Sequence, residues 1–218
     1  TLRRRSASAM VLLHVKRSDK DTFLFETPAA TEVDVVIRDV VKVHNLRHKL
    51  NRLTAAAKGL AQHGIMKLPE QQGLDDDTPL LDDYDVTSGE TAPRAKVERG
   101  AHFNADPTER RTGNAPASDM AAVIMKTVED GEALTSERQV QMKQFTTAKA
   151  LEEAIANIRG ATMIVYPMGL PDYDTVRQIL EEREELEGGT AMEVLEHDKA
   201  ALWFCSKDMQ RDKLLSEY

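Results

Sequence analysis

The sequence predicts an α+β fold, and three observations support that class. Two short apolar runs, Met10–Lys16 and Thr22–Glu26, flank a polar turn, which is typical of a β-hairpin. Apolar residues then recur every three or four positions through a long segment, as in an amphipathic helix. Two later runs rich in β-branched or aromatic residues, Met163–Tyr166 and Leu202–Cys205, predict further strands.

The long helix follows the hairpin. Thr31 is a suitable N-cap for a helix that begins near Glu32. The apolar positions run through Val36–Leu60, either as one helix or as two helices broken near Asn45, and Gly64 is expected to end them. The apolar stripe is narrow, so it fits packing on the protein's own core or on a partner helix.

The second half of the chain predicts mainly helices. Thr146 or Thr147 is expected to cap a helix that ends at Gly160. The Met163–Tyr166 run then predicts a buried strand, and Asp174 is expected to cap the next helix.

Composition excludes several classes of protein. The net charge is −8 and hydrophobic residues make up 41% of the chain, with no stretch near the roughly 20 apolar residues of a membrane span. The single cysteine, Cys205, excludes an internal disulfide and fits a reducing compartment. Residues 1–64 carry 12 Lys and Arg against 6 Asp and Glu, whereas residues 65–218 carry 17 against 31. The basic part is therefore suited to an acidic protein surface or to the chain's own acidic part, and the pattern does not indicate nucleic-acid binding.

The sequence contains no phosphate-binding loop, dinucleotide fingerprint, zinc-protease motif or nucleophile elbow. His44 and His48 have the i, i+4 spacing that zinc can use, but the surrounding sequence offers no clear third ligand. We expect solvated histidines and a buried, unreactive Cys205, so the sequence predicts no enzyme, no metal and no cofactor. An enzyme that uses His44, His48 or Cys205 is the remote alternative.

Two loops are candidate partner-binding sites. Pro167–Pro171 is stiffened by two prolines and presents apolar side chains, which lose little entropy on binding. Arg110 and Arg111 lie in a polar loop, where guanidinium groups can grip a partner's carboxylate. The alternatives are a well-packed structural loop and a solvent-exposed hinge. The residues expected to contact a partner are Arg110, Arg111, Tyr166, Met168, Leu170, Tyr173 and Asp174.

The C-terminal run Leu202–Tyr218 resembles a ubiquitin-like pattern of strand, turn and Leu-Ser-Asp-Tyr segment. Preceded by a hairpin and a helix in Met10–Leu60, it predicts a ubiquitin-like β-grasp split by a large, mainly helical insertion. The last strand of such a fold is then expected beyond residue 218, or from a partner. The matching residues are Leu202, Phe204, Ser206, Lys207, Met209, Leu215, Ser216 and Tyr218.

This interpretation divides the chain into five parts. Residues 1–9 form a disordered extension, 10–64 the first part of the β-grasp domain, and 65–117 an acidic flexible linker. Residues 118–199 form the helical insertion with one strand, and 200–218 the incomplete second part of the β-grasp.

The run Arg159–Asp174 (RGATMIVYPMGLPDYD) closely resembles a segment of the Kurly family, also called cilia- and flagella-associated protein 298. The stretches Met10–Lys16, Arg110–Pro116 and Leu202–Tyr218 resemble the same family, although Thr112 departs from its pattern.

The resemblance implies a non-catalytic protein of motile cilia or flagella. In that role it is an interaction component of the axoneme, needed for dynein arm assembly or attachment and for ciliary movement. The alternative is a cytoplasmic preassembly factor that acts on dynein arms before their transport. The implied partners are proteins of the axoneme, of the dynein assembly machinery or of microtubule-associated complexes. Neither nucleic acid nor membrane is implied, and the implied localisation is the axoneme and the cytoplasm.

Overall fold

The structure is a computed structural model that describes residues 9–19, 21–74 and 99–218. The described residues combine helices with two small sheets, so the predicted α+β class is confirmed. Most of the predicted extension, residues 1–8, and the acidic centre of the predicted linker, residues 75–98, lie outside the described residues. The ubiquitin-like topology and the five-part division stay predictions.

The chain forms two compact units. Unit 1 contains residues 1–51, 130–154 and 186–218, and unit 2 contains residues 52–129 and 155–185. The three long helices, α1 (Val33–His63), α2 (Ser118–Thr135) and α4 (Ala148–Val165), each contribute one part to each unit. The units are described separately below.

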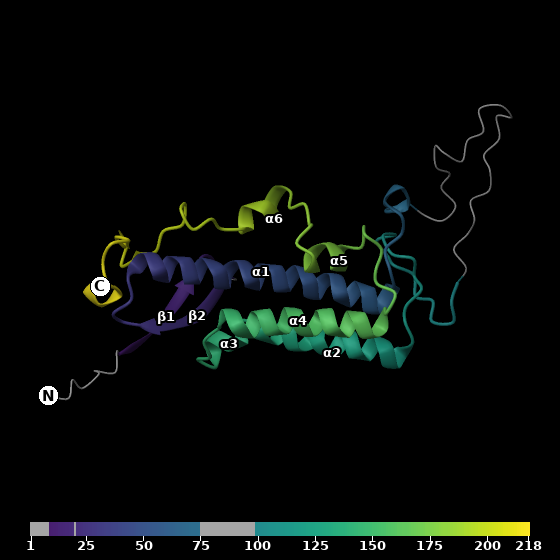
Figure 1. Cartoon of the computed structure of the whole chain (residues 1–218), viewed down its shortest axis with the longest axis horizontal. Coiled ribbons are helices and arrows are strands. Elements are labelled where there is room, and N and C mark those ends of the chain that lie inside the picture. The colour runs from purple at the N-terminus through teal and green to yellow at the C-terminus, as the bar shows by residue number, and fades with distance from the viewer. Residues whose placement is uncertain (1–8, 20, 75–98) are drawn as a thin grey trace, which may run out of the picture. The chain divides into compact units, whose positions relative to one another are not determined.

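Unit 1 contains the predicted hairpin. Strands β1 (Met10–Lys16) and β2 (Thr22–Pro28) pair antiparallel, with Met10 opposite Pro28 and Lys16 opposite Thr22. Figure 1 shows this hairpin beside the first half of α1. Phe23 is buried on β2, as expected for a strand that packs one face on a helix. The short helix α3 (Arg138–Gln141) contacts β2.

Helix α1 is continuous over 31 residues, so the alternative of two helices broken near Asn45 is wrong. Its apolar stripe is buried at Val36, Val40 and Val43 in unit 1, which favours core packing over a free partner-binding face. The predicted N-cap is wrong, because the helix begins at Val33 and the Thr31 hydroxyl instead accepts a hydrogen bond from Thr27.

Two predictions of side-chain exposure in unit 1 are also wrong. His44 was expected to be solvated but is 3% exposed, because it faces the turn of the hairpin. Cys205 was expected to be buried but is exposed, because it and Ser206 form the left-handed turn between β3 (Trp203–Phe204) and β4 (Lys207–Asp208).

The C-terminal segment of unit 1 covers the start of α1. Val33 donates its backbone N–H to Lys213, and Asp34 donates to Arg211. The Arg211 guanidinium pairs with the Asp34 carboxylate and donates to two backbone carbonyls, at His197 and Ala200. These contacts satisfy N–H groups that a helix leaves free in its first turn. Helices α6 (Gly188–Glu193) and η3 (Leu215–Glu217) complete this part.

Unit 2 is helical. Its core is formed by the second half of α1, the first part of α2, the second half of α4 and the short helix α5 (Thr175–Leu180); a 3-10 turn, η1, spans Pro69–Gln71. Gly64 ends α1 as predicted: it has φ +76°, and a Cβ there would lie 2.0 Å from the backbone oxygen of Asn114. The buried core residues include Leu53, Ala57, Leu60, Ile124, Val128, Ile158, Val176 and Ile179.

The predicted strand Met163–Tyr166 is wrong. Helix α4 passes through Gly160, where a side chain would meet nothing within 4 Å, and ends at Val165. Met163 and Ile164 are 66% and 64% exposed. The residues 118–199 therefore contain helices in place of the predicted single strand. Thr147 does cap α4 as predicted, because its hydroxyl accepts the N–H of Ala150.

Candidate functional site

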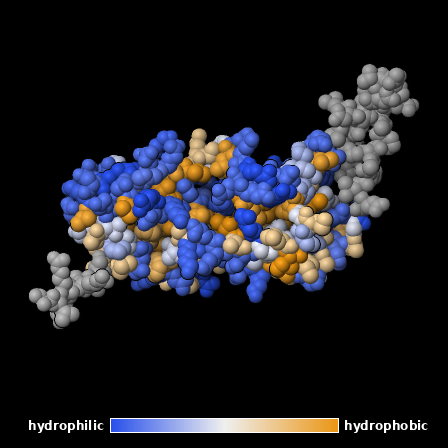
Figure 2. Space-filling model, in the orientation of Figure 1, coloured by the Kyte–Doolittle hydropathy of each residue, from blue (hydrophilic) through white to orange (hydrophobic). Residues whose placement is uncertain are grey.

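The candidate site is the loop Tyr166–Tyr173 of unit 2, which follows α4. Met168 at its tip is 97% exposed, the highest value among the exposed large hydrophobic residues that the structure describes. Gly169 has φ +84°, and its N–H bonds to the carbonyl of Tyr166, so the loop turns back tightly. The turn therefore presents an apolar side chain to solvent on a defined backbone. Figure 2 shows hydrophilic residues over much of the face in view, with hydrophobic residues between them.

The loop is anchored on both sides of its tip. Leu170 is 6% exposed, so one of the predicted contact residues is a core residue that holds the loop. Arg177 on α5 donates a hydrogen bond of 2.7 Å to the Leu170 carbonyl and forms an ion pair of 2.9 Å with Asp172. Because backbone and side chains both fix the loop, little conformational entropy remains for a partner to remove.

Asp174 is the central anchor and is fully buried. One carboxylate oxygen accepts the N–H of Val176 at 2.9 Å, which caps α5 as predicted. The other accepts the N–H of Met66 at 3.1 Å and an N–H of Arg111 at 3.3 Å. Asp174 is therefore a structural residue that joins the loop to the start of α5 and to the segment after α1.

The sequence predicts that Arg111 is exposed and binds a partner, but the structure buries it. It is 7% exposed and donates to the Gly64 carbonyl at 2.7 Å and to the Ala56 carbonyl at 3.0 Å, besides its pair with Asp174. A buried guanidinium requires such acceptors, because an unpaired buried charge is strongly destabilising. Arg110 is exposed, so only the first of the two arginines is available to a partner.

The turn that positions these arginines depends on Asp106, a residue that the sequence analysis did not single out. Its carboxylate accepts backbone N–H groups from Thr108, Arg110 and Arg111 at 2.9, 3.2 and 2.9 Å. Burial by itself would raise the pKa of Asp106, but these hydrogen bonds lower it overall. The Asp-Pro-Thr sequence at 106–108 is the signal that marks this turn.

An open hollow of about 580 Å³ lies beside the loop within unit 2. Its wall includes Met168, Leu170 and the half-buried Tyr166. Burial raises the pKa of Tyr166 to about 12, and among the described residues its hydroxyl has no hydrogen-bond partner. The half-buried Tyr173 lies near the end of the loop. The structure thus brings Tyr166, Met168 and Leu170 together and places Arg111 and Asp174 beneath the surface.

The described residues contain no helix that combines the length and apolar character needed to cross a bilayer. The fold and the site define an α+β protein in which an exposed apolar loop is anchored on a buried ion pair.

Comparison with known proteins identifies the family. The chain is 39% identical to cilia- and flagella-associated protein 298 of Rattus norvegicus, over 96% of this chain and 71% of that protein. It is 40% identical to the Homo sapiens protein of the same name and 37% identical to the Drosophila melanogaster protein, with the same coverage. The chain belongs to the cilia- and flagella-associated protein 298 family.

The family assignment supports a cilium-related role, and the relatives' names describe no enzymatic activity. No family model matches the chain, and no solved structure matches it.

Proposed function

We propose that this chain is a non-catalytic interaction component of the ciliary or flagellar axoneme, needed for dynein arm assembly or attachment. Family membership supports the ciliary role, and the absence of a catalytic motif from the sequence supports a binding function. The loop Tyr166–Tyr173 is the surface that docks on the axonemal partner.

The exposure of Met168 is the observation that carries this proposal. A methionine that is 97% exposed on an anchored turn contributes nothing to the core, yet it offers a flexible apolar group to an apolar pocket. The neighbouring hollow lets a partner's side chain pack against Tyr166 and Leu170 at the same time. Arg110, in a separate loop, supplies an exposed cation for a partner's carboxylate.

The test compares two charged substitutions at exposed methionines. Met168→Glu places a carboxylate in the proposed interface, and Met142→Glu places the same charge at a residue that is 48% exposed in unit 1. Tagged chains are expressed in ciliated cells that lack the endogenous protein, and cell bodies, detergent-soluble matrix and salt-washed axonemes are blotted separately.

We expect the wild type and Met142→Glu to remain on salt-washed axonemes and Met168→Glu to move to the soluble fractions. Equal retention of both variants contradicts the loop as the docking surface. Confinement of the wild type to the cell body contradicts the axonemal role and favours a cytoplasmic preassembly factor for dynein arms.

A further inference from the structure

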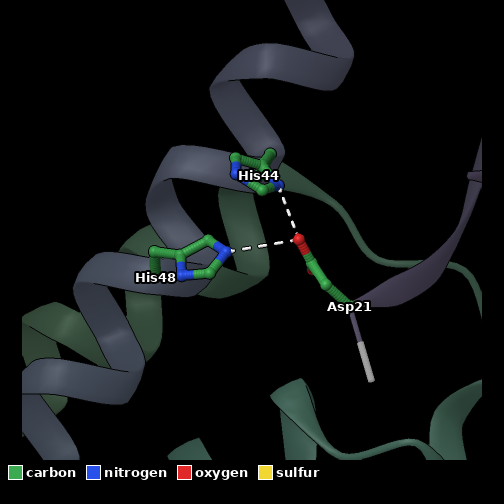
Figure 3. A group of neighbouring side chains, drawn as sticks. All are labelled: Asp21, His44 and His48. Carbon is green, nitrogen blue, oxygen red and sulfur yellow. Dashed lines mark hydrogen bonds and ion pairs between the residues drawn. The ribbon is translucent and has the colours of Figure 1, made fainter. Parts of the chain in front are cut away.

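Three potential metal ligands converge in unit 1. Asp21 lies in the turn before β2, and His44 and His48 are one helical turn apart on α1. Figure 3 shows both imidazole rings directed at the same carboxylate oxygen of Asp21. The ligand atoms of the three residues all lie within 4.8 Å of one another. The hairpin thus supplies the third ligand that the sequence around the histidines does not show.

The distances fit a small tetrahedral ion. His44 Nδ1 is 3.3 Å from Asp21 Oδ2, and His48 Nε2 is 3.4 Å from the same oxygen. Zinc bonds of about 2.0–2.1 Å in a tetrahedron place neighbouring ligand atoms about 3.3–3.4 Å apart. Good N–H···O hydrogen bonds are shorter, near 2.9–3.0 Å. Both distances to Asp21 therefore match an edge of a tetrahedral site, and the contact with His48 also has hydrogen-bond geometry.

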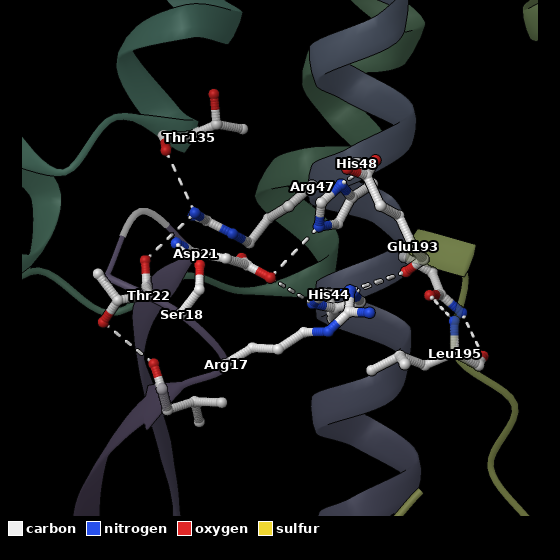
Figure 4. Close-up of polar contacts among 12 residues, drawn as sticks. Arg17, Ser18, Asp21, Thr22, His44, Arg47, His48, Thr135, Glu193 and Leu195 are labelled. Carbon is white, nitrogen blue, oxygen red and sulfur yellow. Dashed lines mark hydrogen bonds and ion pairs between the residues drawn. The ribbon is translucent and has the colours of Figure 1, made fainter. Parts of the chain in front are cut away.

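The second nitrogen of each histidine is held by Glu193, the last residue of α6. His44 Nε2 lies 2.9 Å from the Glu193 backbone oxygen, and His48 Nδ1 lies 3.2 Å from the Glu193 carboxylate (Figure 4). Metal-binding histidines typically donate their other N–H to a carbonyl or a carboxylate in this way. Glu193 thus contacts the outer nitrogen of both histidines.

For His44, the short contact with the Glu193 backbone oxygen indicates which nitrogen carries the proton, because a carbonyl oxygen can only accept. In a neutral imidazole, the nitrogen that donates to Glu193 holds the hydrogen, so the other nitrogen presents a lone pair. In His44, which is 3% exposed, that lone pair faces an oxygen of Asp21. A lone pair and a carboxylate oxygen repel each other at this distance, whereas a cation between them binds both.

Two arginines lie near the cluster. Arg47 donates to the backbone carbonyls of Thr22 and Thr135, each at 3.2 Å. Arg17 donates to the Met192 carbonyl at 3.1 Å, and its other terminal nitrogen is 3.4 Å from His44 Nε2. Their positive charge lowers the affinity of the cluster for a cation, but their hydrogen bonds to backbone carbonyls leave the Asp21 oxygen that faces the histidines available.

We propose that Asp21, His44 and His48 bind a divalent transition-metal ion of the zinc type, with Glu193 as the outer-shell residue that orients both imidazoles. Two imidazole nitrogens and one carboxylate oxygen are a ligand set that zinc uses, with water in the fourth position. The bound ion ties the turn of the hairpin to α1 and, through Glu193, to α6. Its effect is to stabilise unit 1.

The experiment titrates the purified full chain with Zn²⁺ in competition with a chromophoric chelator. We expect one ion per chain, and a melting temperature that rises with the concentration of free zinc. Substitution with Co²⁺ is expected to give the visible absorption of a tetrahedral complex.

Matched variants separate this site from adventitious binding. Asp21→Asn and His48→Gln alter half-buried ligands with little change of shape and are expected to weaken binding more than about 100-fold; Glu193→Gln is expected to weaken it about 10- to 100-fold. His102→Gln changes an exposed histidine of unit 2 and should leave the affinity unchanged.

The absence of stoichiometric zinc binding by the wild type overturns the proposal. Unchanged affinity in Asp21→Asn and His48→Gln overturns it too, because binding then occurs elsewhere. Circular dichroism without metal verifies that each variant is folded. If His48→Gln is unfolded, unchanged zinc affinity in Asp21→Asn overturns the proposal. If both variants are unfolded, unchanged zinc affinity in Glu193→Gln overturns it.

Discussion

Replacing Asp174 with alanine should strongly destabilise the chain, because three separate contacts depend on one buried carboxylate. The substitution removes the N-cap of α5, the acceptor of the Met66 N–H and the counter-ion of Arg111. Loss of an N-cap costs about 1 kcal/mol. Loss of one member of a buried ion pair costs about 3–5 kcal/mol. The pair is 8% and 0% exposed, so solvent screens it little.

The contributions overlap, because Arg111 keeps its hydrogen bonds to the carbonyls of Gly64 and Ala56. We therefore expect a total loss near the low end, about 4 kcal/mol in the free energy of unfolding. That is a large share of the roughly 5–15 kcal/mol that stabilises a typical domain.

The assay is urea-induced unfolding followed by circular dichroism, with Asp172→Ala as the matched control. Asp172 lies in the same loop and also pairs with an arginine, but its side chain is 73% exposed. The control should lose less than about 1 kcal/mol. If Asp174→Ala lies within about 1 kcal/mol of the control, the assignment of Asp174 as the anchor of the loop is refuted.

Three further predictions concern unit 2. Tyr166→Phe should leave stability unchanged or raise it by up to about 1 kcal/mol, because it removes a buried hydroxyl that has no partner among the described residues; a clear loss in urea unfolding contradicts this. Gly64→Ala should cost about 2 kcal/mol or more, because it adds a clash with Asn114 to a left-handed backbone. Gly73 has φ +78° but lies in open space, so Gly73→Ala should lower the free energy of unfolding less than Gly64→Ala does. Equal losses in the two variants would exclude the clash with Asn114. The lowered pKa of Asp106 implies a stabilising contribution that is complete above its unfolded pKa of about 3.9 and is lost as the pH falls through the lower folded value. Asp106→Asn should therefore reduce the fall in the free energy of unfolding at acidic pH. An unchanged fall contradicts the contribution of Asp106.

The parts of the fold that depend on local signals could be predicted from the sequence. The hairpin has a polar turn between two apolar runs, and both strands form as expected. Helix α1 follows from its apolar period and ends at His63, just before Gly64, where only glycine fits the backbone. Asp174 was recognised as a cap because that role depends on the two residues that follow it.

The Met163–Tyr166 run shows where local propensity fails. Its β-branched and aromatic residues predict a strand, but Leu151, Ile155 and Ile158 already establish a helical period. That period continues to the buried Thr162 and the half-buried Val165, while Met163 and Ile164 fall on the exposed face. Tertiary packing of the helix therefore overrides the strand preference of four residues.

The candidate sites depend on contacts between distant segments. Arg111 is 63 residues from Asp174, and Asp21 is 23 residues from His44. No spacing rule connects such pairs, so sequence patterns alone do not predict that one of two adjacent arginines is buried or that a carboxylate lies against the histidines. The exposed tip at Met168, in contrast, follows from the Pro-Met-Gly turn and was expected.

Counting dynein arms in rescued cilia tests the proposed function most directly. Ciliated cells that lack the endogenous protein are supplied with the wild type, Met168→Glu or Met142→Glu at equal levels, and axonemal cross-sections are examined by electron microscopy. We predict that the wild type and Met142→Glu restore the arms and that Met168→Glu, although folded, does not. Full restoration by Met168→Glu would contradict the loop as the docking surface, and arms that are intact without the protein would contradict the proposed role.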